Sequence, residues 1–146
     1  MKNEERKPAV RRTLLFLCTG NSCRSQMAEA FARRRFPDAD VFSAGIEAHG
    51  LNPRMLAVMR ERGFSMDGHR SKTLAELPAR TRWDLLVTVC GNAEKSCPTL
   101  PAERRAHAPF DDPPALAKTL PPGADALAVY RRVRDEIEAF VERLEP

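Results

Sequence analysis

The sequence predicts a single α/β domain, a small doubly wound sheet of four parallel strands with helices on both faces. Apolar, strand-like runs alternate along the chain with segments of helical periodicity, which is typical of βαβ units joined by right-handed crossovers. The 146 residues are enough for one conventional core, and no internal repeat or low-complexity stretch marks a second domain. We therefore expect one domain over residues 12–146, after a charged and disordered N-terminal tail over residues 1–11.

Four segments are expected to form the strands. The first is an apolar run that ends at Leu17 and is followed by a loop of small and polar residues. A continuous apolar run of this kind is typical of a parallel strand that is buried on both faces. The expected strands are 13–17, 40–43, 84–89 and, more weakly, 105–108.

Helices alternate with these strands, and the first of them follows the loop directly. Asn52 is a suitable N-cap and Pro53 a suitable first residue for a second helix, which stops at Gly63. Ser71 begins a short third helix, and Asp125 caps the last one. The last helix carries an apolar stripe at spacings of three and four, which we expect to pack on the sheet: Ala126, Tyr130, Val133, Ile137, Phe140 and Leu144.

The loop between the first strand and the first helix is the strongest candidate site. It consists of Cys18, Thr19, Gly20, Asn21, Ser22, Cys23, Arg24 and Ser25. Successive backbone N–H groups in such a loop form a nest for an anion, and the helix N-terminus adds its dipole. Arg24 can hold two oxygens of a tetrahedral oxyanion, and the same positive field favours the thiolate form of Cys18. The alternative is a buried core cysteine beside a surface arginine, but ligands of open α/β sheets bind at such strand-to-helix junctions.

The stretch CTGNSCRSQMAE, residues 18–29, resembles the phosphate-binding loop of the low-molecular-weight tyrosine phosphatase superfamily, and more narrowly that of its thioredoxin-coupled arsenate reductases. The resemblance covers residues 12–145, nearly the whole chain. It implies the strand order 2-1-3-4 for the sheet. Further segments match the family in the same order: SAGIE at 43–47, NP at 52–53, HRS at 69–71, VTVC at 87–90, FDDP at 110–113 and RVRDEI at 132–137.

The resemblance implies an enzyme that reduces arsenate to arsenite in arsenic detoxification, with reduced thioredoxin as the electron donor. Phosphate and arsenate have the same shape and charge, so the loop alone does not distinguish a reductase from a phosphatase. A reductase needs a second thiol close to Cys18. Cys90 ends a predicted strand, and in a parallel sheet that end lies at the same edge as Cys18.

Cys97 is expected to be the third thiol of the relay. If the segment after Cys90 is helical, the two Cα atoms lie about 10 Å apart, whereas a disulfide requires about 4.4–6.8 Å. The pair can therefore close only when the segment unwinds. The resemblance implies a Cys18–Cys90 disulfide and then a Cys90–Cys97 disulfide, which thioredoxin reopens by thiol exchange. The alternative is that Cys97 is a free structural thiol.

Asp112 matches the family's general acid, which would protonate the departing oxygen, although an aspartate before proline is locally also a common turn residue. Ser25 is expected to hydrogen-bond the thiolate and Asn21 to pin the loop, while Cys23 receives no redox role. One alternative function is a low-molecular-weight protein tyrosine phosphatase that hydrolyses phosphate monoesters through Cys18. Another is a thiol-based sensor that binds its ligand without turnover.

Composition and spacing exclude several other classes. The net charge of +4 suits an anionic substrate. The arginines are not accompanied by aromatic residues on which bases could stack, so we do not expect nucleic-acid binding. No segment resembles a membrane span or a signal peptide, so we expect a cytoplasmic monomer. The cysteines lack the C-x2-C spacing of a zinc site, and we expect neither a metal nor a cofactor.

Potassium-binding members of the family use positions that match Asn21, Glu29 and Ser43, together with an aspartate. Lys72 stands at that fourth position here. An ammonium group would repel a potassium ion and could substitute for its charge, so we expect activity that is insensitive to potassium.

Overall fold

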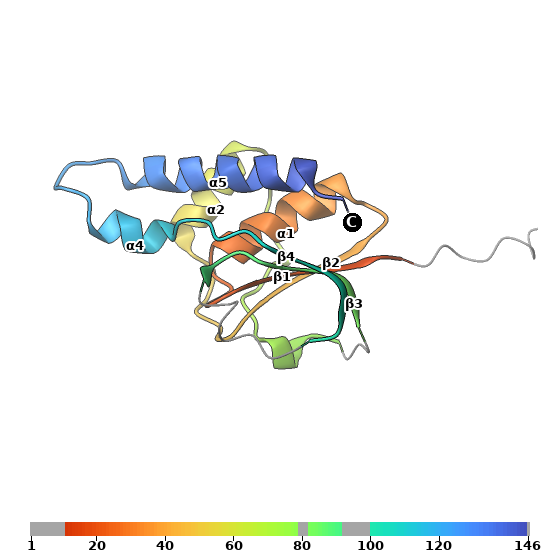
Figure 1. The fold of residues 1–146 in the computed structure, drawn as a ribbon. Helices are drawn as coiled ribbons and strands as arrows, with labels where there is room; N and C mark the ends of the chain where they lie inside the picture. Colours follow the sequence, from red (N-terminus) through yellow and green to blue (C-terminus); the bar gives the residue numbers. More distant parts are fainter. Residues whose placement is uncertain (1–10, 79–81, 92–99, 146) are drawn as a thin grey trace, which may run out of the picture.

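The structure is a computed structural model that describes residues 11–78, 82–91 and 100–145. Four parallel strands form one sheet in the order β2-β1-β3-β4, which confirms the predicted fold class and strand order (Figure 1). Cys97 and the predicted tail, except for Arg11, lie outside the described residues. The strands are β1 Thr13–Cys18, β2 Asp40–Gly45, β3 Trp83–Thr88 and β4 Ala102–His107.

The carboxyl ends of the strands meet at one edge of the sheet. β1 is one of the two inner strands and is buried along its whole length. Cys18 at its end pairs with Gly45 of β2, and Leu17 pairs with Thr88 of β3. The loops that follow β1 and β3 therefore start beside each other, and this register directs Cys90 toward the loop after Cys18.

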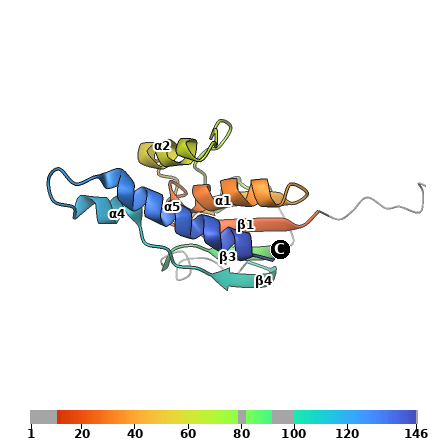
Figure 2. The ribbon, with the colours of Figure 1, turned by 90° about the horizontal axis from the view of Figure 1, so that it is seen from above.

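The longer helices cover one face of the sheet. Figures 1 and 2 show α1 (Arg24–Arg35), α2 (Pro53–Glu61) and α5 (Ala126–Arg143) on that face, while the 3₁₀ helix η2 (Leu74–Glu76) lies on the other. The short helix α4 (Pro113–Lys118) packs against α5 at the carboxyl edge of the sheet. This edge is consequently bordered by the start of α1, by α4 and by the loop after β3.

The predicted caps and the predicted stripe are present. Asn52 Oδ1 accepts the N–H groups of Arg54 (2.9 Å) and Met55 (3.1 Å), and Asp125 caps α5 in the same way. Within the stripe on α5, burial is deepest in the middle of the helix, where it packs on α1 and α2. Tyr130, Val133 and Ile137 are buried, and Ala126, Phe140 and Leu144 are half-buried.

Among the predicted elements, two differ from the prediction by more than one or two residues at a boundary. No α-helix begins at Ser71; instead Gly45 N donates to Lys72 O (2.8 Å) and bridges Thr73, which holds this segment extended until η2. β4 begins at Ala102, three residues before the predicted start at position 105. Its first residues are mostly charged and exposed on an edge strand, and therefore lack the apolar alternation that marks a strand in a sequence.

Candidate active site

The loop between β1 and α1 lies at the carboxyl edge of the sheet, as the sequence predicted. Cys18 closes β1 and is 3% exposed, and Arg24 is the first residue of α1. Asn21 has φ 48°, the single positive φ of a non-glycine residue within the described ranges. Asparagine tolerates this left-handed conformation better than most residues, and the conformation lets the chain turn sharply within the loop.

The carbonyl groups of this loop accept hydrogen bonds from the segment that follows β2. In the described chain the N–H groups of residues 19–22 donate to no protein acceptor, so these donors are available to an anion. The bonds to the carbonyls are Ile46 N to Cys18 O (3.3 Å), Glu47 N to Thr19 O (2.9 Å), His49 N to Gly20 O (2.9 Å) and Asn52 N to Ser22 O (3.1 Å).

The thiol of Cys18 lies 2.8 Å from Ser25 Oγ. Asn21 Nδ2 donates to that same hydroxyl (2.8 Å) and to Ser43 Oγ (2.9 Å). Because Ser25 already accepts from Asn21, its own proton can be donated to the sulfur, which stabilises a thiolate. The structure thus gives Cys18 the contact with Ser25 that the sequence analysis expected, and Asn21 joins this part of the loop to β2.

A second layer of polar side chains supports Asn21 from behind. Gln26 Nε2 donates to Asn21 Oδ1 (2.9 Å), and Ser43 Oγ donates to Glu29 Oε1 (2.5 Å). All of these side chains are at least 96% buried. We call Asn21, Ser25, Gln26, Glu29 and Ser43 the loop network. It ties the loop to α1 and β2 without solvent, so the loop has little freedom to relax.

The carboxylate of Glu29 is balanced by cations at the back of this network. Arg33 Nε lies 2.8 Å from Oε2, and Lys72 Nζ lies 3.8 Å from Oε1. Burial lowers the pKa of Lys72, and the attraction of Glu29 opposes that shift. The ammonium group of Lys72 therefore lies beside Glu29, and the backbone N–H of Lys72 donates to Asn21 Oδ1 (2.9 Å).

Arg24 and Asp112 face each other at the mouth of a pocket of about 310 Å³. Arg24 Nη2 lies 3.8 Å from Asp112 Oδ1, and Arg24 Nη1 donates to Phe110 O (3.1 Å). The Arg24 side chain is largely buried, whereas that of Asp112 is 45% exposed. The pocket is lined by Cys18, Thr19, Gly20, Ser22, Cys23, Arg24, His49, Asn52, Asp112 and Pro114.

Cys23 is the second cysteine of the loop, and it is buried like Cys18. Burial raises the pKa of Cys23, and the neighbouring Cys18 raises it further. Its burial therefore disfavours the thiolate form of Cys23.

Cys90 lies beside the loop, as its place at the end of β3 predicts. Its Sγ atom is 3.3 Å from Thr19 Oγ1, and the residue is 2% exposed. The structure thus brings a second buried thiol next to the residue that follows Cys18. The predicted third thiol, Cys97, falls outside the described residues.

His49 lines the pocket, a position that the sequence analysis did not find. A Cβ atom on Gly20 would lie 2.3 Å from His49 Nδ1, so the ring packs directly on the loop. His49 Nε2 pairs with Glu47 Oε1 at 2.6 Å. Only the backbone bond to Gly20 places this ring at the pocket, and no local sequence signal reports such a contact.

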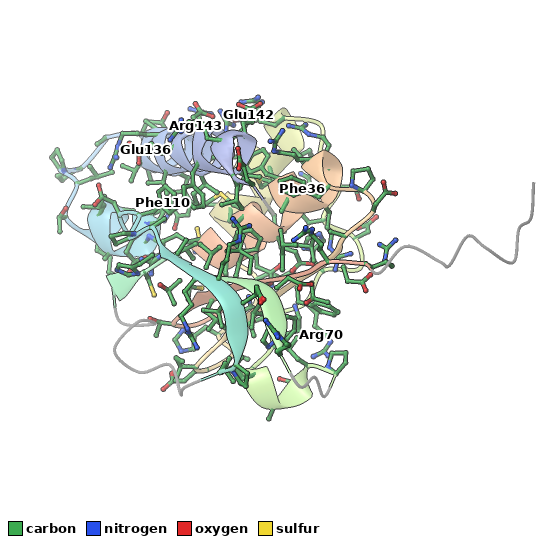
Figure 3. All side chains as sticks on the ribbon, turned by 45° about the vertical axis from the view of Figure 1, so that its right-hand side comes forward. Phe36, Arg70, Phe110, Glu136, Glu142 and Arg143 are labelled. Atoms are coloured by element: carbon green, nitrogen blue, oxygen red, sulfur yellow. The ribbon has the colours of Figure 1, made fainter. Side chains whose placement is uncertain are left out.

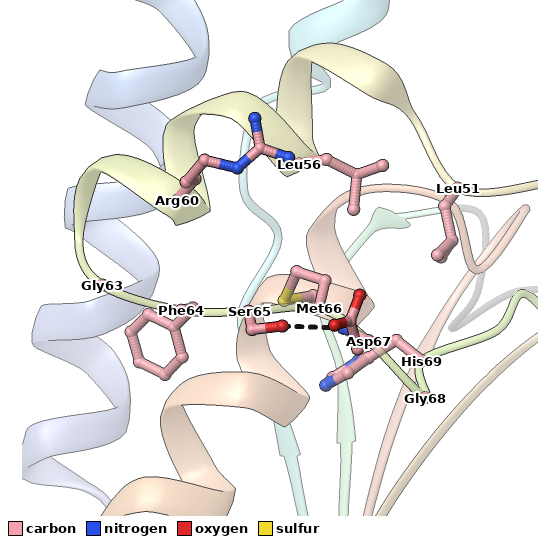
Figure 4. Close-up of a pocket in the computed structure, with 10 residues that line it drawn as sticks. All are labelled: Leu51, Leu56, Arg60, Gly63, Phe64, Ser65, Met66, Asp67, Gly68 and His69. Atoms are coloured by element: carbon pink, nitrogen blue, oxygen red, sulfur yellow. Dashed lines mark hydrogen bonds between the residues drawn. The ribbon is translucent and has the colours of Figure 1, made fainter.

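A larger cavity of about 700 Å³ lies elsewhere, between α2 and the segment 63–69 (Figure 4). It contains no cysteine, and its polar side chains include Arg60 and Asp67. His69 at its edge bonds Gln26 Oε1 through Nδ1 (3.0 Å). Cys18, most of the loop that follows it and Arg24 line the smaller pocket, which is therefore the candidate active site.

No group of three or more histidine, cysteine or acidic side chains suited to a metal ion occurs within residues 11–78, 82–91 and 100–145. Among the helices in those ranges, none is long and apolar enough to cross a membrane.

The sequence and the fold match known proteins over nearly their whole length. The family model described as low molecular weight phosphotyrosine protein phosphatase matches residues 13–145. An arsenate reductase of Halalkalibacterium halodurans is 46% identical over 129 residues, covering 87% of this chain and 90% of the relative. An arsenate reductase of Bacillus licheniformis is 44% identical over 135 residues, covering 91% and 94%.

Solved structures give the same result for the fold. An arsenate reductase in an oxidized state superimposes with a TM-score of 0.73 at 29% identity, covering 91% of this chain and 95% of the other. An arsenate reductase in a phosphate binding state gives a TM-score of 0.71 at 29% identity, covering 90% and 94%.

Proposed function

The chain belongs to the low molecular weight phosphotyrosine protein phosphatase family, and from this premise we propose that it reduces arsenate to arsenite. The observation that carries the proposal is the buried thiol of Cys90 beside the anion loop, 3.3 Å from Thr19 Oγ1. Hydrolysis of a phosphate ester needs one thiol, whereas two-electron reduction needs two. The relatives named arsenate reductase support the same activity.

In the first step the Cys18 thiolate attacks the arsenic atom of arsenate, which is held by the loop N–H groups and Arg24. A Cys18–arsenic bond forms and an arsenic–oxygen bond breaks. Asp112 gives its proton to the departing oxygen, which leaves as water. Ser25, 2.8 Å from Cys18 Sγ, stabilises the thiolate before the attack.

In the second step Cys90 attacks the sulfur of Cys18. The electron pair of the sulfur–arsenic bond passes to arsenic, which is reduced from As(V) to As(III) and leaves as arsenite. A Cys18–Cys90 disulfide forms. Cys97 then attacks Cys90, which releases Cys18 as a thiolate and produces a Cys90–Cys97 disulfide.

We propose reduced thioredoxin as the partner that reopens the Cys90–Cys97 disulfide. This places the protein in a reducing compartment, the cytoplasm, where a disulfide is a transient catalytic state. A monomer suffices for all of these reaction steps, since one chain carries the loop, the acid and all three thiols.

The test follows NADPH consumption with arsenate, thioredoxin and thioredoxin reductase, for the wild type and for Cys97→Ser. We expect arsenate-dependent turnover in the wild type and its loss in Cys97→Ser. A Cys23→Ser variant is the matched control, because it removes a buried thiol of the loop without a role in the relay.

A phosphatase is the second candidate, because the loop donors, Arg24 and Asp112 also suit a phosphate ester. Cys97→Ser would leave ester hydrolysis intact. Hydrolysis of an aryl phosphate by a wild type that does not turn over arsenate would establish the phosphatase and reject the reductase. A sensor would instead bind arsenite stoichiometrically, with turnover of neither substrate.

A further inference from the structure

The segment that carries Asp112 is fastened to the rest of the site through its backbone. Phe110 N donates to Val89 O (3.2 Å), next to Cys90. Phe110 O accepts from Arg24 Nη1 (3.1 Å). One residue thus joins the strand end that bears the second thiol to the arginine of the anion loop. We call residues 110–112 the acid segment.

Side chains fasten the same segment to α5. The ring of Phe110 meets that of Phe140 edge-to-face, with centroids 5.7 Å apart, and Figure 3 shows Phe110 below α5. Arg132 Nη2 on α5 lies 3.0 Å from Asp111 Oδ2. Arg132 Nη1 lies 3.0 Å from Glu136 Oε2, one turn further along the helix. The guanidinium group of Arg132 therefore pairs with Glu136 of the same helix and with Asp111 of the acid segment.

We propose that Arg132 is a positioning residue for Asp112 and acts through Asp111; this rests on the proposed role of Asp112 as the general acid. The side chain of Asp112 is 45% exposed, and its Oδ1 atom lies 3.8 Å from Arg24 Nη2, which is a long contact for an ion pair. Its direction is consequently set by the chain on either side. On one side the buried Pro113 begins α4, and on the other Asp111 is held by Arg132.

Arg131 provides a matched control on the same helix. It pairs with Glu61 of α2 (2.8 Å) and with Asp125 (3.2 Å), and within the described part of the chain none of its ion pairs reaches the acid segment. Both arginines are partly exposed and both join carboxylates. Substitution of either removes comparable helix contacts, but only Arg132 contacts the residue beside Asp112.

The test compares two esters that differ in their need for a proton donor. Phenol leaves only when protonated, whereas 4-nitrophenolate leaves without help, so a displaced acid slows phenyl phosphate selectively. We expect Arg132→Ala and Asp111→Asn to lower kcat/KM for phenyl phosphate by about twofold to fivefold, the range that an exposed ion pair supports. 4-Nitrophenyl phosphate should be unaffected, Arg132→Lys should restore part of the rate, and Arg131→Ala should change neither ester.

An equal loss on both esters, or the same selective loss in Arg131→Ala, would overturn the inference in favour of a general effect on α5. If the wild type hydrolyses neither ester, arsenate turnover of the same variants decides: a loss in Arg132→Ala and Asp111→Asn but not in Arg131→Ala supports the positioning role, and equal rates in all of them overturn it. Ester hydrolysis does not need Cys90 or Cys97. A wild type that shows the ester pattern but no arsenate turnover would therefore reject the proposed reductase and support the positioning role.

Discussion

The loop network and the ion pairs between α2 and α5 fasten two different parts of this protein. In the loop network every polar side chain is buried, and each makes specific short hydrogen bonds. The ion pairs, which we call the helix network, join the end of α2 to α5, and most of their side chains contact solvent. Its members are Glu61, Arg62, Arg131, Arg134, Asp135 and Glu138.

The two networks also differ in redundancy. Each carboxylate of the helix network has two arginine partners; Glu61, for example, pairs with both Arg131 and Arg134. Loss of one arginine leaves the other, and water can solvate what remains. Asn21 has no such substitute, because its amide bonds both Ser25 and Ser43 in a buried site. The position of the Cys18 sulfur therefore depends on single contacts, whereas the packing of α2 on α5 depends on several exchangeable ones.

The largest expected effect is that of Asn21→Ala in the loop network. The change leaves buried groups without partners, among them the N–H of Lys72 that now donates to Asn21 Oδ1 (2.9 Å). It also places alanine at a positive φ. We expect a loss of about 2–3 kcal/mol in the free energy of unfolding and loss of nearly all turnover. Urea unfolding and the arsenate assay measure the two effects, and unchanged stability would contradict the role given to this network.

A smaller effect is expected for Arg134→Met in the helix network. Arg134 is 7% exposed and donates to Val58 O (2.9 Å), while Glu61 and Asp135 each keep another arginine. Methionine fills most of the same apolar space. We expect destabilisation of about 1 kcal/mol with turnover unchanged, again from urea unfolding and the arsenate assay. A loss of turnover as large as that of Asn21→Ala would show that the two networks are not separable.

A third prediction concerns the cation at the back of the loop network. Because Lys72 Nζ lies 3.8 Å from Glu29, the wild type should have the same rate in sodium and in potassium at equal ionic strength. Lys72→Ala should lower the rate in sodium, with a few-fold recovery in potassium. Arg70→Ala is the control, since Arg70 pairs with the exposed Glu76. Stimulation of the wild type by potassium would refute the hypothesis that the ammonium group of Lys72 takes the place of a potassium ion.

The smallest expected effect is a pH dependence of the helix network. The hydrogen bond from Arg131 holds the pKa of Glu61 below its usual value of 4.5. A lowered folded pKa contributes stability that is present above the unfolded value and is lost as the pH falls through the folded one. The thermal midpoints of the wild type and Arg131→Ala should therefore differ slightly at neutral pH and converge well below pH 4.5. Salt should reduce the difference at neutral pH as well, because the pair is exposed.

The anion loop could be predicted from sequence because its signals are local. An apolar strand, a loop of small polar residues and an arginine at the helix start occur within one short segment, and the structure confirms this order. The contact of Cys18 with Ser25 lies inside the same segment and was expected. His49, by contrast, reaches the pocket only because its backbone pairs with Gly20, and the role of Arg132 depends on where α5 passes the acid segment.

The sequence by itself determined the fold class, the loop and the residue types at the site, because apolar runs, helical periodicity and caps each involve only a few neighbouring residues. Tertiary structure decided which distant groups meet. Thr19 lies beside Cys90 because β1 and β3 pair in one register, and Lys72 lies beside Glu29 because β2 holds the segment before η2 extended. Such contacts join residues that are far apart in the chain, and only the packing of the whole sheet and its helices brings them within reach.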